Sequence, residues 1–371
     1  MLVDIVFMII KMLTNSSEKG NYSIQHSGLT ILTMLKVRRM SFGRMCKNVN
    51  LSDLVIMERT WTVSDAEIEE FLAEASKLVR ECGDIIADAI NSQQNTEIQT
   101  KEQGEGHGSA VLTQTDMKVE QHLINGLSAK FPDHKFIGEE NVSNDGLIKE
   151  YTNAPTWIID PIDGTMNFIH SNPLVCTSIG LTVNKRLVAG IVNCPMIDHM
   201  YSAIKGKGAK LNGVKVLKTS GVKNISKAMM IMELPVGANQ DKTSVAMTNL
   251  GHMMSKAHAV RAPGPAALDI AWVGAGSADC YFHFGKICIY IIENFSHTRD
   301  LTPGIHCWDM AAGALIVSEA GGVVMDPTGA EFDLMARDIL VASSRELADQ
   351  VREFLTLYKT DRDYAEKNEY L

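Results

Sequence analysis

The chain has 371 residues, of which 45% are hydrophobic and 21% are charged. This length and balance are ordinary for a soluble globular chain of one or two domains. They exclude a disordered chain, a collagen-like fibre and a coiled coil. The formal net charge of −9 argues against a protein that coats nucleic acid, because neutralising phosphate needs an excess of Lys and Arg.

The charge is unevenly distributed along the chain. Residues 1–52 carry a net charge of +5, and the remainder carries −14. The absence of acidic residues from 20–52 is weakly typical of a mitochondrial transit peptide, but we favour a basic extension over 1–56 that is disordered or not native to the protein. The apolar stretch 1–13 is shorter than the ~20 residues of a membrane span. We therefore expect a cytoplasmic protein without a membrane partner.

The cysteine pattern predicts neither a disulfide framework nor a zinc site. Their number is odd and no C-x-x-C motif occurs, which favours a reducing compartment. We expect most of them to be small buried side chains. The seven are Cys46, Cys82, Cys176, Cys194, Cys280, Cys288 and Cys307.

Residues 57–225 are predicted to form an α+β half. Ser64, with Glu67 three residues later, predicts the capped start of an amphipathic helix. A polar, glycine-rich mobile loop is expected over 91–109, and a second amphipathic helix after Asp116. An antiparallel meander is expected beyond it, with a hairpin turn at Asn212 and Gly213. Its predicted strands cover 157–159, 176–183, 187–192 and 200–204.

Residues 226–358 are predicted to form an α/β half, followed by a charged tail over 359–371. Gly321 and Gly322 mark the end of one helix, since glycine accepts the positive φ of a helix stop. An α+β half followed by an α/β half is the simplest architecture. The predicted strands are 228–232, 258–261, 279–284, 323–326 and 338–342, and the predicted helices are 240–255, 265–275, 308–320 and 345–357.

The most informative motif is Asp160-Pro161-Ile162-Asp163-Gly164-Thr165, which follows three bulky apolar residues. Acids at the carboxyl end of a buried strand lie where α/β proteins bind ligands. Pro161 and Gly164 predict a tight turn that aims Asp160 and Asp163 at one point. Thr165 would then cap a short helix whose free N–H groups can hold phosphate. An ordinary surface turn of the same composition is the alternative.

Further carboxylates occur at the ends of other predicted elements. Glu139 and Glu140 follow an apolar stretch, and Asp309 opens a helix in the second half. Four carboxylates cannot gather without a strong counter-charge, and hard oxygen ligands suit Mg²⁺. Two such ions about 4 Å apart could together activate water and neutralise a leaving oxygen.

Four segments carry a family resemblance: 136–140, 157–165, 304–309 and 319–322. In wording, order and spacing they resemble the inositol monophosphatases, and the resemblance extends over about residues 60–355. It implies an αβαβα sandwich, a homodimer, and lithium-sensitive, Mg²⁺-dependent hydrolysis of phosphomonoesters.

The resemblance also implies roles for individual residues. Glu139, Asp160 and the carbonyl of Ile162 would bind a first Mg²⁺, and Asp160, Asp163 and Asp309 a second, with two or three ions in each active site. Glu139 and Thr165 would position the attacking water, and Asp116 would support Thr165. The substrate would contact Asp163, Gly164, Thr165, Gly264, Pro265, Ala266, His283 and Asp309.

The sequence departs from the family pattern at a position that contacts substrate. Relatives have a glutamate that binds inositol hydroxyls where this chain has His283. An imidazole in place of a carboxylate acceptor should alter hydroxyl recognition without altering the metal chemistry. The alternative is that His283 points at solvent.

A second departure is an insertion of nineteen residues over 286–304. Its apolar beginning is unusual for a surface loop, and we hypothesise that it is untranslated-type sequence retained in a gene model. If it displaces Asp309, the chain is a non-catalytic homologue. The remaining alternative is a phosphatase of the same superfamily that acts on another sugar, polyol or nucleotide.

Overall fold

The computed structural model describes residues 59–92, 98–100, 111–142, 148, 150–234, 240–285 and 304–357. The basic extension, the insertion up to residue 303 and the charged tail lie outside these ranges. The chain divides into two units, Met1–Met57 and Glu58–Leu371. Every element below belongs to the second unit.

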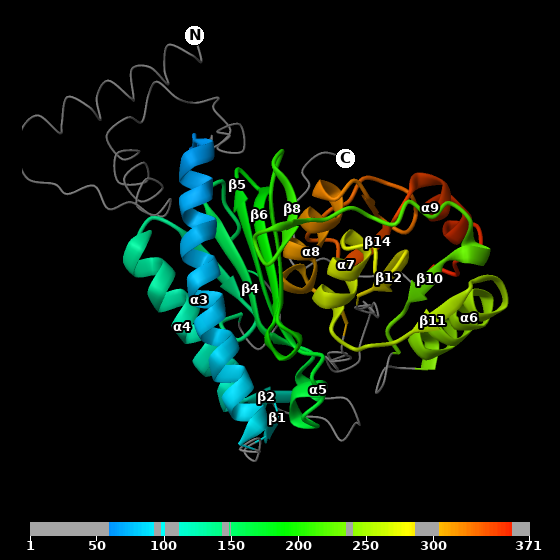
Figure 1. Ribbon diagram of the computed structural model, residues 1–371, viewed down its shortest axis with the longest axis horizontal. Coiled ribbons are helices and arrows are strands. Elements are labelled where there is room, and N and C mark those ends of the chain that lie inside the picture. Colours follow the sequence, from blue (N-terminus) through cyan, green and yellow to red (C-terminus); the bar gives the residue numbers. More distant parts are fainter. Residues whose placement is uncertain are drawn as a thin grey trace, which may run out of the picture. The chain divides into compact units, whose positions relative to one another are not determined.

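Two long helices form the outer layer of the first half. The predicted capping box at the start of the first is confirmed: Ser64 Oγ accepts the Glu67 N–H, and the Glu67 carboxylate accepts the Ser64 N–H at 2.7 Å. The second begins two residues before Asp116 rather than after it. The helices pack against each other along one face of a sheet (Figure 1). They are α3 (Asp65–Asn91) and α4 (Gln114–Lys130).

That sheet has seven strands in sequential order. The first two strands pair in parallel, and the rest form the predicted antiparallel meander. Asn212 and Gly213 have positive φ, as the hairpin turn requires. The strands are β3 (Lys135–Gly138), β4 (Thr156–Asp163), β5 (Cys176–Val183), β6 (Arg186–Cys194), β7 (His199–Ile204), β8 (Gly208–Leu211) and β9 (Lys215–Val216).

Shorter elements accompany the first sheet. A two-stranded ladder of β1 (Ile98–Thr100) and β2 (Val111–Thr113) pairs residues inside the range predicted as a mobile loop, so that prediction is wrong for 98–100. The polar composition of 91–109 concealed a strand whose partner lies beyond the range. The others are α5 (Thr165–Ile169) and the 3₁₀ turn η2 (Pro195–Ile197). A further 3₁₀ turn, η3 (Ile225–Lys227), leads into the second half, where Ile225 packs into the core.

The second half contains a mixed five-stranded sheet of order β11-β10-β12-β14-β13. Its last helix ends at Arg352, five residues earlier than the sequence predicts. The strands are β10 (Met229–Ile231), β11 (Ala259–Arg261), β12 (Cys280–Phe284), β13 (Val323–Met325) and β14 (Asp338–Ala342). The helices are α6 (Gln240–Lys256), α7 (Ala266–Gly274), α8 (Cys307–Glu319) and α9 (Arg345–Arg352).

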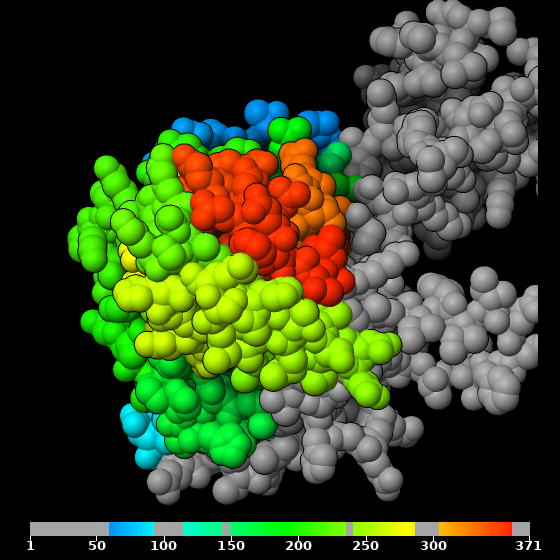
Figure 2. Space-filling view, turned by 90° about the vertical axis from the view of Figure 1, so that its right-hand side faces the viewer, coloured from blue at the N-terminus to red at the C-terminus, as the bar shows by residue number. Residues whose placement is uncertain are grey.

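Helices α7 and α8 lie between the two sheets, while α6 and α9 cover the outer face of the second (Figures 1 and 2). Close approach of α8 to the first sheet depends on glycine, because a Cβ on Gly180 would lie 2.6 Å from Ala311 Cβ. The layers therefore follow the order α, β, α, β, α, and the predicted sandwich is confirmed. The inner surfaces of the two sheets meet on α7 and α8.

Two other expectations concern the cysteines and the membrane. Cys82, Cys176, Cys194, Cys280 and Cys307 are free and buried, as predicted. Within the described ranges, no helix combines the length and the apolar character needed to cross a bilayer.

Candidate active site

The acidic motif lies on the last part of β4. The strand continues through Asp163 and changes register between Asp160 and Asp163, so the predicted tight turn is instead an irregular strand end. Both carboxylates are buried, at 2% and 7% exposure. The irregularity allows two side chains three residues apart to face the same point.

Residue 164 rather than Thr165 occupies the cap position of α5. Gly164 has φ 89°, in the left-handed region, and it has no side chain that could cap the helix. Thr165 is the first helical residue, and its hydroxyl donates to the Ile162 carbonyl at 3.1 Å. The prediction that Thr165 caps the helix is therefore wrong, because the positive φ that glycine permits places the chain reversal one residue earlier.

The second half contributes Asp309, which lies in the first turn of α8. One ligand atom from each of Asp160, Asp163 and Asp309 lies within 4.8 Å of the others. Asp309 Oδ2 also accepts the backbone N–H of His306 at 2.6 Å. The insertion therefore does not displace Asp309 from the other two carboxylates.

The three carboxylates repel one another in a buried place. Burial, followed by repulsion from Glu139, Asp163 and Asp309, raises the pKa of Asp160 well above its usual value. Burial and the charge of Asp309 do the same to the pKa of Asp163. Within the described residues, Asp160 Oδ1 is buried without a hydrogen-bond partner. A hard divalent cation supplies both the missing charge and the missing partner, so the donor set fits Mg²⁺.

The structure joins Asp163 to the segment predicted to contact substrate. Asp163 Oδ2 accepts the N–H of Ala267 at 2.7 Å, and Oδ1 accepts the N–H of Ala266 at 3.2 Å. The Cys176 thiol donates to the same carboxylate at 3.5 Å. Pro265, the cap residue of α7, provides no side-chain hydrogen bond. Asp163, on β4 of the first sheet, caps the helix in its place. Residues 264–266 thus lie beside the acidic cluster.

Neighbouring side chains hold this segment in place. Gly264 has φ 115°, and its N–H donates to Glu233 Oε1 at 3.2 Å. The Asn167 amide donates to the carbonyls of Leu174 and Pro263, at 2.8 Å and 2.9 Å. The conformation of the segment therefore depends on contacts from both halves.

Asp269, on α7, is a buried acid that sequence reasoning missed. It has no exposed surface, and neither carboxylate oxygen has a hydrogen-bond partner among the described residues. Burial, and then the neighbouring Glu233, raise the pKa of Asp269 well above its usual value. Its signal in the sequence is a single acid inside the apolar run 266–274.

Helix α4 carries two further buried acids. Asp116 is 1% exposed and Glu120 is 2% exposed. Glu120 Oε2 accepts the Glu140 N–H at 2.9 Å, and a Cβ on Gly138 would clash with the same oxygen. Glu120 therefore fixes the backbone around Glu139, a role not predicted. Its spacing of three and seven residues from buried leucines was the available signal.

His283 lies on β12, two residues after Tyr281, and the two rings stack with their planes 3° apart. Its Nδ1 is buried without a partner in the described part of the chain, so the ring does not simply point at solvent. Burial, and then Lys242 and Arg337, lower the pKa of His283 well below its usual value. The imidazole is therefore neutral at physiological pH.

Known proteins resemble this chain in sequence and in architecture. The model of the inositol monophosphatase family matches residues 67–356. Inositol monophosphatase 1 of Xenopus laevis is 38% identical over 310 residues, covering 83% of this chain and 98% of the relative. Inositol monophosphatase 2 of Solanum lycopersicum is 38% identical over 288 residues, covering 76% and 96%.

Solved structures agree in fold. The Thermotoga maritima IMPase superimposes with a TM-score of 0.62 at 26% identity, covering 77% of this chain and 96% of the other. The extragenic suppressor protein suhB of Bartonella henselae gives 0.63 at 24% identity, covering 78% and 98%. The sequence match covers most of the chain and includes the carboxylates that the fold brings together. The chain belongs to the inositol monophosphatase family.

Proposed function

We propose that this chain is a Mg²⁺-dependent phosphatase that hydrolyses inositol monophosphates to inositol and phosphate. The convergence of Asp160, Asp163 and Asp309 within 4.8 Å carries the proposal. The names of the relatives support inositol monophosphates as substrates. Inositol recycling in phosphatidylinositol signalling is the corresponding physiological role.

The proposed metal ligands come from both halves of the chain. Glu139, Asp160 and the carbonyl of Ile162 would hold one Mg²⁺, and Asp160, Asp163 and Asp309 another, with two or three ions in all. When bound, Mg²⁺ supplies charge neutralisation and acidifies a coordinated water. Glu120 supports this assignment, because it fixes the backbone beside Glu139 through the Glu140 N–H.

Protein groups would orient the reactants around these ions. Glu139 and the Thr165 hydroxyl would hold the attacking water in line with the scissile bond, and Asp116 would support Thr165. The backbone N–H groups of Gly164 and Thr165 would receive phosphate. No cysteine nucleophile is invoked: burial raises the pKa of Cys176 well above its usual value, so that side chain is a thiol.

The polyol would lie between Gly264, Pro265, Ala266, His283 and Asp309. A neutral imidazole both donates and accepts one hydrogen bond, whereas a carboxylate accepts only, so His283 should change which hydroxyls are preferred. Another sugar, polyol or nucleotide phosphate is the alternative substrate. His283→Glu is expected to raise activity on inositol 1-phosphate relative to the other substrates, and an unchanged ranking would remove His283 from substrate recognition.

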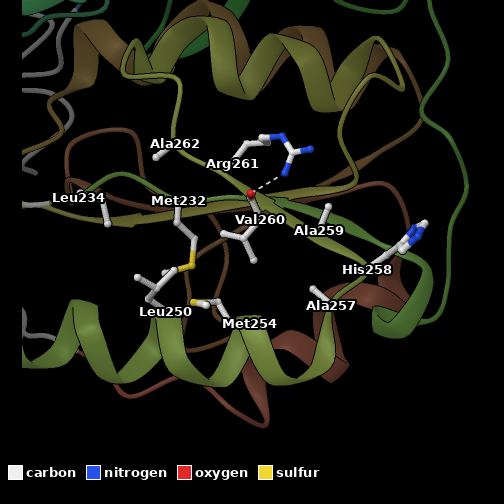
Figure 3. A pocket seen from close by; sticks show the side chains of 10 residues that line it. All are labelled: Met232, Leu234, Leu250, Met254, Ala257, His258, Ala259, Val260, Arg261 and Ala262. Atoms are coloured by element: carbon white, nitrogen blue, oxygen red, sulfur yellow. Dashed lines mark hydrogen bonds between the residues drawn. The ribbon is translucent and has the colours of Figure 1, made fainter.

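We also propose a cytoplasmic homodimer. An apolar pocket of about 360 Å³ between β11 and α6 supports an interface on the second half (Figure 3). Met232, Leu250 and Met254 turn toward one another there, and Met254 is 68% exposed. Exposed apolar surface of this kind favours association. Sedimentation of the wild type and of Met254→Glu tests this, and a monomeric wild type would contradict it.

The function is tested by phosphate release from a panel of inositol, sugar and nucleotide monophosphates, with Mg²⁺ or with EDTA. The expected result is Mg²⁺-dependent release, fastest from inositol monophosphates and inhibited by lithium. Asp309→Asn should abolish release, whereas Lys223→Ala, on the surface, should not. Release that persists in EDTA, or that ignores lithium, would contradict the proposal.

A further inference from the structure

We infer that Arg337 is a positioning residue that holds the proposed metal ligand Asp309 in place. The inference rests on the proposed metal site. Arg337 lies immediately before β14, twenty-eight residues beyond Asp309 in the sequence. No motif connects the two residues, and the connection becomes visible only in the contacts of the folded chain.

The guanidinium of Arg337 makes two contacts with the segment that leads into α8. Its Nε donates to the Ile305 carbonyl at 2.9 Å. One terminal nitrogen lies 2.8 Å from His306 Nε2, and because guanidinium only donates, this hydrogen bond forms in the tautomer that carries its proton on Nδ1. The rigid geometry of the guanidinium fixes both groups relative to each other.

His306 transmits this constraint to Asp309. Its backbone N–H donates to Asp309 Oδ2 at 2.6 Å. Its ring stacks on Trp308 with centroids 4.4 Å apart and planes 6° apart, and Trp308 is 4% exposed. The contact with Arg337 therefore restrains His306, which itself hydrogen-bonds to the carboxylate of Asp309.

Arg337 is in turn fixed by its own surroundings. It is 6% exposed, and its φ of 64° lies in the left-handed region, which disfavours residues other than glycine. A Cβ on Gly285 would lie 2.7 Å from both Arg337 Cβ and the Arg337 carbonyl oxygen. A strained backbone of this kind persists when the surrounding packing determines it, and such positions cluster at functional sites.

These contacts lie at the junction between the end of β12 and the start of α8. In the sequence, eighteen residues separate Gly285, at the end of β12, from Gly304. Gly304 nonetheless lies against Gly285, and a Cβ on Gly285 would also lie 3.2 Å from the Ile305 carbonyl oxygen. Arg337 contacts Ile305 and His306, the two residues after Gly304, and so restrains α8 from the side of β14.

The test is Mg²⁺ binding to the full chain, measured by titration calorimetry without substrate. Outer groups that orient metal ligands typically contribute about 10–100-fold in affinity. Arg337→Ala should weaken Mg²⁺ binding by about 10-fold or more. Arg337→Lys keeps the charge but lacks the planar guanidinium that contacts two groups at once, and it should weaken binding by several-fold. Arg352→Ala is the matched control, since Arg352 donates to the carbonyls of Pro327 and Thr328 in the same half. It should lower Tm without changing Mg²⁺ affinity.

A double-mutant comparison separates positioning from general stability. In an Asp309→Asn background, Arg337→Ala should cause little further loss of Mg²⁺ affinity, because the ligand that it positions is already gone. Equal losses in both backgrounds would overturn the inference, as would wild-type affinity in Arg337→Lys and Arg337→Ala. Absence of Mg²⁺ binding by the wild type would instead overturn the proposed function.

Discussion

The carboxylate of Asp163, on β4, accepts the backbone N–H of Ala267, on α7, at 2.7 Å. The Asp163 carboxylate therefore has two roles: it caps α7, the helix between the sheets, and it belongs to the acidic cluster. Asp160, by contrast, has a buried oxygen with no hydrogen-bond partner in the described ranges. The two acids should therefore respond differently to neutralisation.

Without Mg²⁺, Asp160→Asn is expected to stabilise the protein. The pKa of Asp160 is raised in the folded state. The contribution of this carboxyl group to the free energy of unfolding is therefore complete below the unfolded pKa of about 3.8, and it is lost as pH rises through the folded pKa. At pH 7.5 the variant should gain about 1–2 kcal/mol in EDTA, because each tenfold change in protonation is worth ~1.4 kcal/mol. Asp163→Asn should gain less, since it weakens a cap worth about 1 kcal/mol. Thermal unfolding in EDTA checks both; a destabilised Asp160→Asn would contradict the account.

Mg²⁺ binding should release protons and strengthen with pH. Asp160 and Asp163, whose pKa values are raised, must lose their protons before they can bind a cation. Calorimetry in buffers of different ionisation enthalpy measures the release. Affinity should rise as pH rises above the usual carboxyl pKa of about 3.8, and a pH-independent affinity without proton release would refute the electrostatic description.

Asp269→Asn is expected to stabilise the protein increasingly as pH rises. The pKa of Asp269 is raised by burial and by Glu233, so the wild type loses stability above the unfolded value of about 3.8, whereas the amide does not titrate. A gain of about 1–3 kcal/mol near pH 8, shrinking toward pH 4, is expected. The matched control is Asp279→Asn, whose carboxylate accepts the Met229 N–H at 2.6 Å. It should lose stability, and a similar loss in Asp269→Asn would contradict the prediction.

Deleting residues 286–303 should leave the fold intact. A Cβ on Gly304 would lie 3.0 Å from the Gly285 carbonyl carbon, so the two glycines that flank the deletion are already adjacent. Removing residues from a connection lowers the entropic cost of bringing its ends together, so Tm should stay equal or rise slightly. A control deletion of equal length over 280–297 removes β12 and should prevent folding.

Failure of the 286–303 deletion to fold, or loss of its Mg²⁺ binding, would show that the segment has a structural role. The gene-model hypothesis has its own test in peptide mapping of the native protein. Detection of a peptide spanning 289–295 would exclude it.

The fold and the acidic cluster were predictable because their signals are local. Ser64 with Glu67 marks a helix start within four residues, and the 160–165 motif contains two of the three clustered acids. The proline and glycine at the end of β4 are typical of a turn, and the sequence therefore predicts one. The pairing of Asp163 with Cys176, which extends the strand instead, leaves no local pattern in the sequence. Strand pairing across thirteen residues decided the outcome.

The contacts that complete the site could not be predicted in the same way. Arg337 reaches Ile305 and His306 across about thirty residues, and Glu233 reaches Gly264 across a similar distance. Such partners depend on packing between layers rather than on periodicity. Glu120 and Asp269 were missed for a different reason, since an acid on an apolar helix face is visible in the sequence but was not followed there.

The most direct test of the central claim is Mg²⁺-dependent phosphate release from inositol 1-phosphate by the wild type and by Asp160→Asn. Asp160 would be shared by both metal sites, so the variant should lose activity by at least about 100-fold while remaining folded. Wild-type release that requires Mg²⁺, with its loss in the variant, is the predicted result. Equal activity in the two proteins, or equal inactivity at saturating Mg²⁺, would contradict the account.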